Sequence, residues 1–377
     1  MTDDAPLHAD QIAGAPHPRD TARLMGQSKA EETFLDAFTS GRMHHAWLLT
    51  GPQGIGKATL AYRIARFLIA TPAQGDDGLF GAPPPPTTLE IGVDHPVAVR
   101  MRAGAEPGLR VIRRSENDQG RLRADIVVDN IRKLAEFFQL SAVDGGHRVV
   151  IVDSAEEMNT SAANALLKML EEPPANTTLL LISHQPSRLL PTIRSRCRTL
   201  RLSPLSPADL NDALMQAGSD VVSNAALAEL SSGSVGAALR LINLSGLEIY
   251  NELVALMATM PQMDRPRARA LADAAAQRGA EDKLALLIEL IDILLARLAR
   301  AGASGQPANE AAPQEAATFA RLAPSPWAAR QWATRGTEVS DRLRHGRAVN
   351  LDPSVLVLDT LIKLNDTARD ITSPAPA

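Results

Sequence analysis

The segment Gly51-Pro-Gln-Gly-Ile-Gly-Lys-Ala58 decides the fold of this chain. It follows the pattern GxxxxGK, in which glycines let backbone N–H groups surround a phosphate while the lysine reaches the β and γ oxygens. The next position departs from the pattern, because Ala58 stands where a Ser or Thr hydroxyl would ligate Mg²⁺. The segment therefore predicts a phosphate-binding loop (P-loop) without its usual metal ligand. Its candidate nucleotide-binding residues are Gly51, Gly54, Gly56 and Lys57.

Thr59 is the hydroxyl nearest to the missing metal ligand, and we keep it as a candidate nucleotide contact. One residue along a helix is a turn of about 100°, however, which directs this hydroxyl to another side. The flanks fit the motif, since Ala46–Thr50 is a short apolar run and Lys57–Ala70 has apolar residues at helical spacing. Strand, glycine loop and helix in this order favour a phosphate loop over an ordinary glycine turn, which is the alternative.

The composition indicates a globular protein of two or three domains, since 377 residues exceed one compact core. The net charge of −4 gives no global attraction to DNA, and 3% aromatic residues argue against a base-stacking platform for single strands. The single cysteine, Cys197, excludes an internal disulfide and a multi-cysteine zinc site. With a polar N-terminus and no apolar run of about 20 residues, we expect a cytoplasmic protein.

Strands alternate with helices as far as Leu202, which predicts a doubly wound α/β domain around a parallel sheet. The later strands are continuous apolar runs, as in a sheet covered on both faces. Besides the strand and helix that flank the loop, we expect strands at 109–112, 148–153, 178–183 and 199–202, and helices at 20–38, 126–140, 160–171 and 189–194.

From Ser206 onward only helices are legible, and alanine and leucine dominate the last of them, as in a helical bundle. In the bundle we expect helices at 247–260, 266–278, 282–301 and 353–366, interrupted by a soft segment at 302–312. The predicted divisions are a disordered tail at 1–17, an α/β domain at 18–203, a small helical domain at 204–245, a larger helical domain at 246–370 and a tail at 371–377. Within the α/β domain, 71–106 is a Pro- and Gly-rich insertion, of which Thr71–Ile91 is expected to be exposed.

Asp153 ends a hydrophobic strand downstream of the loop, which is where a P-loop ATPase places the acid that helps to hold Mg²⁺. An aspartate that simply caps the following turn is the alternative. In active ATPases the next residue is the glutamate that polarises the attacking water, and here it is Ser154. Glu156 and Glu157 belong to the next turn, and we expect them to face solvent.

Four further motifs occur in order along the chain: Thr21-Ala-Arg-Leu-Met-Gly-Gln-Ser28, His45-Ala-Trp-Leu-Leu-Thr-Gly-Pro52, Asn164-Ala-Leu-Leu-Lys-Met-Leu-Glu-Glu-Pro-Pro174 and Leu190-Pro-Thr-Ile-Arg-Ser-Arg-Cys197. This set resembles that of AAA+ clamp-loader subunits, and most closely the delta-prime type of bacterial DNA polymerase III. The motifs cover Asp20–Leu244, and the remainder is similar only in architecture. The resemblance implies an AAA+ α/β domain, a helical lid at 204–245 and an all-α collar at 246–370.

Membership of such a family implies a ring of AAA+ subunits joined through their C-terminal collars. The implied partners are ATPase subunits and a clamp-opening delta subunit, with the sliding clamp and primed DNA reached through the complex and no membrane involved. In the ring, the arginine of a Ser-Arg-Cys motif reaches into the ATP site of the neighbouring subunit. Arg196 matches this arginine finger. Without the resemblance, a surface salt bridge would be the preferred interpretation of Arg196.

The same resemblance implies what this chain lacks. Gly236 stands where active subunits carry a lid arginine, whereas Ser183 still provides a polar group at the place of the γ-phosphate sensor. The replacements at Ala58, Ser154 and Gly236 together weaken metal binding, water activation and charge neutralisation. We therefore expect a hydrolysis-silent scaffold of the DNA polymerase III holoenzyme, with neither ATPase nor polymerase chemistry of its own, which supplies its arginine finger in trans during DNA replication.

This interpretation requires no cofactor, although the retained loop allows weak ATP or ADP binding. Related subunits insert a four-cysteine zinc module where 71–106 lies here, and because this segment has no cysteine we expect no zinc. The alternatives are an active AAA+ ATPase with an atypical site and an unrelated P-loop enzyme such as a kinase. Turnover of ATP by the isolated chain would favour the active ATPase over the scaffold.

Overall fold

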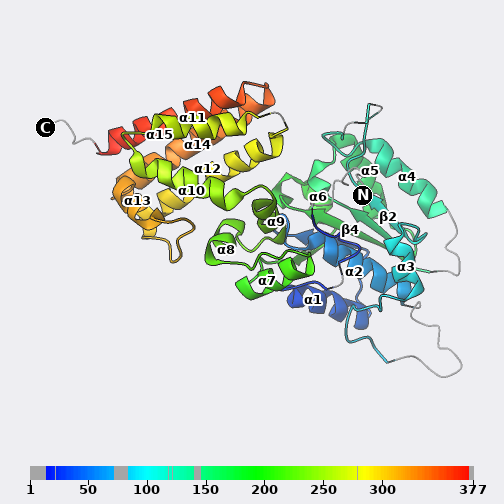
Figure 1. Ribbon diagram of the computed structural model, residues 1–377. Coiled ribbons are helices and arrows are strands. Elements are labelled where there is room, and N and C mark those ends of the chain that lie inside the picture. Colours follow the sequence, from blue (N-terminus) through cyan, green and yellow to red (C-terminus); the bar gives the residue numbers. More distant parts are fainter. Residues whose placement is uncertain are drawn as a thin grey trace, which may run out of the picture. The chain divides into compact units, whose positions relative to one another are not determined.

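The computed structural model describes residues 14–71, 84–139 and 146–372, apart from positions 22, 118, 121 and 278. The chain forms two compact units (Figure 1). Unit 1 comprises Met1–Asp220 with Gly233–Ala237, and unit 2 comprises Val221–Ser232 with Ala238–Ala377. Most of the predicted tail at 1–17, part of the insertion at 71–106 and the last residues of the tail at 371–377 lie outside the described residues. The domain divisions expected from the sequence stay predictions.

Unit 1 is built on a five-stranded sheet in which every pairing is parallel and the strand order is β2-β3-β4-β1-β5. Each residue of β1 and β4 is buried, which agrees with the continuous apolar runs in the sequence. The predicted doubly wound α/β domain around a parallel sheet is confirmed. The strands are β1 (Ala46–Thr50), β2 (Leu109–Ile112), β3 (Arg148–Val152), β4 (Thr177–Ser183) and β5 (Arg198–Arg201).

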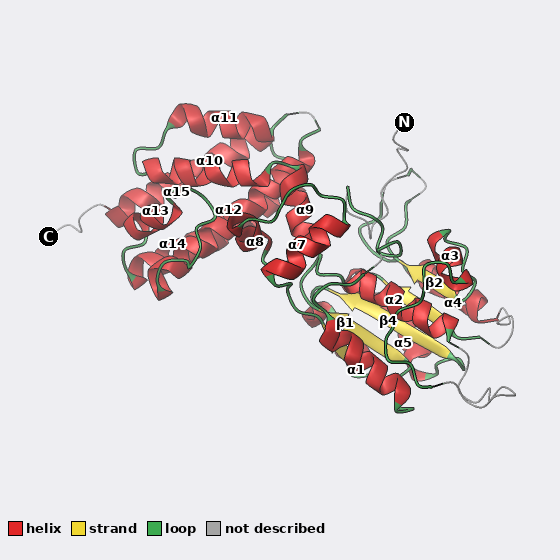
Figure 2. Cartoon of the chain, turned by 60° about the horizontal axis from the view of Figure 1, so that its bottom comes forward, coloured by secondary structure: helices red, strands yellow, loops and turns green. Residues whose placement is uncertain are grey.

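Helices cover both faces of this sheet (Figure 2). On one face, α4 (Val128–Gln139) and α5 (Thr160–Glu171) share a hydrophobic cluster with β1, β3 and β4. On the other face lie α1 (Ser28–Thr39) and α2 (Lys57–Ala70). The remaining helical segments of the unit are α3 (Pro96–Arg102), the short 3-10 turns η2 (Ala155–Glu157) and η3 (Pro186–Arg188), α6 (Pro191–Arg194) and α7 (Pro207–Gln216).

The first helix is shorter than the sequence predicts, because α1 begins only at Ser28. The preceding chain is held in a non-helical path by Gln27, whose buried side-chain amide donates to the backbone oxygens of Ile55 and Ser203 and accepts from the Ser203 N–H. These contacts lie far away in the sequence, so local helix propensity does not reveal them.

The second half of the Pro- and Gly-rich insertion contains a packed helix that was not predicted. Pro96 opens α3, and the His95 ring accepts from the Val97 N–H as its N-terminal cap. Met101 on this helix and Leu89 before it are buried. The expectation of an exposed segment over Thr71–Ile91 is therefore wrong at Leu89.

Unit 2 is all-helical in its described part, as the sequence predicts. Two of its helices, α13 and α14, lie where no helix was expected. The helices after α7 are α8 (Ala225–Ser231), α9 (Val235–Asn243, whose first turn belongs to unit 1), α10 (Gly246–Thr259), α11 (Arg265–Ala275), α12 (Glu281–Ser304), α13 (Glu315–Leu322), α14 (Pro326–Ala348) and α15 (Pro353–Thr372).

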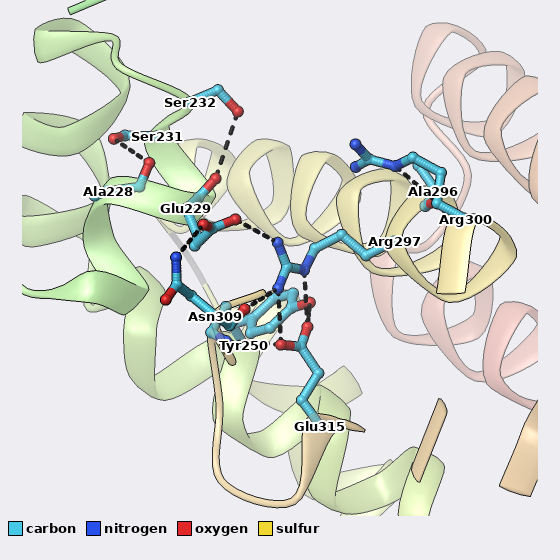
Figure 3. A network of polar contacts seen from close by, with 11 residues as sticks. Ala228, Glu229, Ser231, Ser232, Tyr250, Ala296, Arg297, Arg300, Asn309 and Glu315 are labelled. Atoms are coloured by element: carbon cyan, nitrogen blue, oxygen red, sulfur yellow. Dashed lines mark hydrogen bonds and ion pairs between the residues drawn. The ribbon is translucent and has the colours of Figure 1, made fainter. Parts of the chain in front are cut away.

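A buried polar network joins several of these helices (Figure 3). Arg297 of α12 makes a bidentate pair with Glu315 of α13, in which Nε–Oε1 and Nη2–Oε2 are both 2.9 Å. The Tyr250 hydroxyl of α10 donates to the same Glu315 carboxylate at 2.6 Å. On its other side, Arg297 Nη1 donates to Glu229 of α8, and Nη2 donates to the backbone oxygen of Asn309. The network therefore holds the connection between α12 and α13, which the sequence suggested to be soft.

Among the described residues, no single helix has the length and apolar character needed to cross a bilayer; α8 and α9 pass the same test only as a pair bent by 117°.

Candidate functional site

The carboxyl ends of the parallel strands bring most of the predicted nucleotide-site residues to one edge of the sheet. Thr50, just before the P-loop, is in register with Ser183 at the end of β4. Val152, just before Asp153, is in register with Leu181 of the same strand. This edge is where open parallel sheets bind their ligands. The P-loop, Asp153 and Ser183 therefore share one site.

The P-loop turns into α2 through a glycine in the left-handed region. Gly56 has φ +97° and immediately precedes Lys57, the first residue of the helix. A side chain at this position would strain the turn, which explains why glycine is needed there. Thr59 lies on the first turn of α2 and is buried.

Lys57 is the charged centre of the site and is only 3% exposed. Its Nζ donates to the backbone oxygen of Gly51 at 2.7 Å and to that of Pro52. Burial lowers the pKa of Lys57 to about 8, although the nearby negative charges of Asp153 and Glu156 oppose this shift. The ammonium is thus charged at neutral pH and has acidic neighbours.

Glu156 contradicts the expectation that it faces solvent. Its Oε1 accepts from the backbone N–H groups of His184 at 2.7 Å and of Gln185 at 3.2 Å. Burial by itself would raise the pKa of Glu156, but hydrogen bonds from backbone N–H groups outweigh it and lower the pKa. Glu156 therefore ties the turn after β3 to the end of β4 and places a carboxylate near Lys57. Glu157 is also not free, because it pairs with Arg114 Nε at 2.9 Å.

Ser154, which stands where the resemblance implies a catalytic glutamate in active subunits, forms a neutral pair with His184. Ser154 has φ +59°, and its hydroxyl lies 3.3 Å from Nε2 of His184. Burial and the positive charge of Lys57 lower the pKa of His184 to about 4, opposed by Glu156, so the ring is neutral at pH 7. Sequence reasoning missed both Glu156 and His184. The one available signal was their position just beyond two neighbouring strands, whose carboxyl ends meet at this edge.

The segment Gly233–Ala237 of unit 1 also contacts the P-loop. Ser234 Oγ donates to the backbone oxygen of Gln53 at 2.8 Å, and the Gly236 N–H donates to that of Gly54 at 3.1 Å. Arg240, the next arginine along α9, pairs with Glu289 of α12 at 2.6 Å. Gly236, where the resemblance implies an arginine in active subunits, thus contacts the loop through its backbone.

Arg196 lies at the amino ends of the parallel strands, whereas the P-loop lies at their carboxyl ends. It precedes β5, whose first residue, Arg198, is in register with Trp47 near the start of β1. Arg196 Nη2 pairs with Glu171 at the end of α5 at 2.8 Å, and Nη1 donates to the backbone oxygen of Thr192 at 3.1 Å. Its side chain is 37% exposed. Since the strands rise about 3.3 Å per residue, the five-residue β1 separates this arginine from its own loop by about 16 Å.

Comparison with known proteins finds relatives among DNA polymerase III subunits. Residues 26–206 match the family model of the DNA polymerase III delta subunit. The delta' subunit of Pseudomonas aeruginosa DNA polymerase III is 44% identical over 154 residues, which are 41% of this chain and 41% of that protein. Over part of its length, the chain is therefore similar to the delta' subunits of DNA polymerase III.

More distant relatives extend the same picture. The delta' subunit of Escherichia coli K12 is 35% identical over 213 residues, covering 56% of this chain and 58% of that protein. The gamma/tau subunit of Mycobacterium tuberculosis is 33% identical over 179 residues, covering 48% of this chain and 28% of the relative. The chain thus spans about half the length, or less, of the curated delta-prime relatives it matches.

Proposed function

We propose that this chain is the delta-prime subunit of a DNA polymerase III clamp loader, where it helps to load the sliding clamp onto primed DNA during replication. Its partners would be the ATPase subunits and the clamp-opening delta subunit of the loader, with the all-helical unit 2 as the collar that joins them. Similarity of residues 26–206 to the DNA polymerase III delta family model, and of the chain to curated delta' subunits, supports the assignment. In this role it works in the cytoplasm as part of the polymerase holoenzyme.

Within the ring the chain acts as a hydrolysis-silent donor of an arginine finger. The observation that carries this proposal is the position of Arg196, which lies partly exposed at the sheet edge opposite its own P-loop. A guanidinium there can serve only a site outside its own loop, and a planar, permanently charged fork suits the oxygens of a γ-phosphate. Arg196 now pairs with Glu171, and in the ring the γ-phosphate would replace Glu171 as its partner.

The proposed lack of ATP hydrolysis in the chain's own site rests on three replacements, Ala58, Ser154 and Gly236. Gly51, Gly54, Gly56 and Lys57 remain, so weak binding of ATP or ADP is compatible with the proposal, and no zinc or other cofactor is needed. Reconstitution tests the function. A loader assembled from its ATPase and delta subunits should load clamps onto primed DNA when this chain is added and fail to do so when it is omitted. Equal loading in both mixtures would refute the proposal.

An active ATPase with an atypical site is the second candidate, and Glu156 is the observation that favours it. Its carboxylate lies near Lys57, where it could polarise water. Against this, two backbone N–H groups already occupy Oε1, and its lowered pKa makes it a weaker base. Steady ATP turnover by the isolated chain that disappears in Glu156→Gln would establish this alternative.

A further inference from the structure

The outer rim of the P-loop provides hydrogen-bond acceptors for the beginning of another helix. The first N–H groups of a helix have no partner within it and need acceptors from elsewhere. At the start of α9, Ser234 Oγ accepts from the Ala237 N–H at 3.1 Å and donates to the Gln53 backbone oxygen. The Gly236 N–H donates directly to the Gly54 backbone oxygen. Two carbonyl groups of the loop thus complete the cap of α9.

The approach of the two backbones is close enough to exclude a side chain at the loop. A Cβ added at Gly54 would lie 2.5 Å from Ser234 Oγ and 2.9 Å from the Gly236 Cα. Gly54 also has φ +74°, which favours glycine. On the other side, a Cβ at Gly233 would lie 2.6 Å from the Leu205 backbone oxygen, and the Leu205 N–H donates to the Gly233 backbone oxygen. The segment Gly233–Ala237 therefore packs between the P-loop and Leu205 within unit 1.

We propose that the P-loop of this chain is a docking site for its own segment Gly233–Ala237, and that it holds the start of α9 whether or not a nucleotide is bound. Phosphates are recognised by the N–H groups of such a loop and by its lysine. The docking contacts use carbonyl oxygens instead, which have no attraction for a phosphate. The two sets of contacts therefore do not compete. The loop glycine at position 54 has a structural role that is independent of ATP and of assembly into a ring.

Amide hydrogen exchange of the full-length chain, read by mass spectrometry over residues 234–240, tests this docking. The variant is Gly54→Ala, and the matched control is Gly41→Ala, because Gly41 has a similar φ of +67° but nothing within 4 Å of an added Cβ. Gly54→Ala should speed exchange over 234–240 about five- to thirtyfold, the effect of losing a helix cap, while Gly41→Ala leaves it unchanged.

A second variant acts from the other side of the contact and keeps the test decisive if Gly54→Ala does not fold. Ser234→Ala should speed exchange over the same residues, whereas Ser206→Ala, which removes the equivalent cap of α7, should affect only α7. Protection in the wild type should be the same with and without Mg-ADP. Protection that appears only with Mg-ADP, or exchange in Gly54→Ala and Ser234→Ala equal to that of their controls, would overturn the proposal.

Discussion

Replacement of Glu315 by glutamine should destabilise unit 2 far more than replacement of an exposed glutamate. Glu315 is fully buried, and its carboxylate accepts from Arg297, from the Tyr250 hydroxyl and from the Ala311 N–H at 2.6 Å. Glutamine preserves the size of the side chain but removes its charge and turns one acceptor into a donor. The guanidinium of Arg297, only 7% exposed, would lose its bidentate partner.

The expected magnitude follows from this geometry. Breaking a buried ion pair by removing one partner costs about 3–5 kcal/mol, because the remaining charge stays buried and uncompensated. Arg297 keeps its contacts with Glu229, a partly exposed carboxylate, and with the Asn309 backbone oxygen, so we expect the lower end, about 3 kcal/mol. For a unit of this size, that loss lowers the melting temperature by about 6–12 °C.

Urea denaturation and calorimetry of the full chain measure this loss. The matched control is Glu252→Gln, since Glu252 pairs with Arg267 at 2.8 Å but the two side chains are 49% and 41% exposed. Exposed pairs contribute about 0–1 kcal/mol, so the control should stay close to the wild type. A loss below about 1 kcal/mol for Glu315→Gln would show that the buried network is not the constraint we infer.

Three further outcomes are expected. The isolated chain should hydrolyse ATP at the background rate, because three groups of the nucleotide site are replaced; a rate comparable with an active loader ATPase would contradict this. Burial lowers the pKa of His147 to about 4, as it does for His184. Histidines in the unfolded chain titrate near pH 6.5, so below that pH the unfolded chain binds more protons than the folded chain. The free energy of unfolding of unit 1 should therefore fall as the pH is lowered from 6.5 toward 4, and it should fall less steeply in His147→Gln. Urea titrations at several pH values measure this difference. Burial also raises the pKa of the Cys197 thiol to about 12, which lowers its thiolate fraction more than the higher nucleophilicity of its thiolate compensates. A disulfide reagent at pH 8 should therefore react with it at least about tenfold more slowly than with a free thiol; reaction at the ordinary rate would mean that Cys197 is accessible.

Strong local signals defined much of unit 1 in advance. Ala46–Thr50 and Lys57–Ala70 have the predicted bounds, because an apolar run and a glycine loop delimit them. The helix Thr160–Glu171 also has its predicted bounds, since Asn159 caps its start and prolines follow its end. The parallel sheet then places the P-loop, Asp153 and Ser183 together without further information.

Other features depend on long-range packing that the sequence does not display. The helix α14 buries Trp332, Val339 and Leu343, but small, polar and charged residues fill the positions between them, so no continuous apolar stripe is visible. The orientation of Glu156 follows from the left-handed turn at Ser154 and from N–H groups of the residues that follow β4. Such partners become visible only when the strands are placed side by side.

The proposed role of Arg196 in the ATP site of a neighbouring subunit is tested most directly by DNA-stimulated ATP hydrolysis of the reconstituted loader. The variant is Arg196→Ala, with Arg194→Ala, an exposed arginine of the same segment, as control. An arginine finger contributes about 10³-fold or more, so hydrolysis at one neighbouring site should be lost and clamp loading should fall with it. Arg196→Lys should not restore it, and the stability of the isolated subunit should hardly change. Equal hydrolysis by the wild type and both alanine variants would contradict the claim.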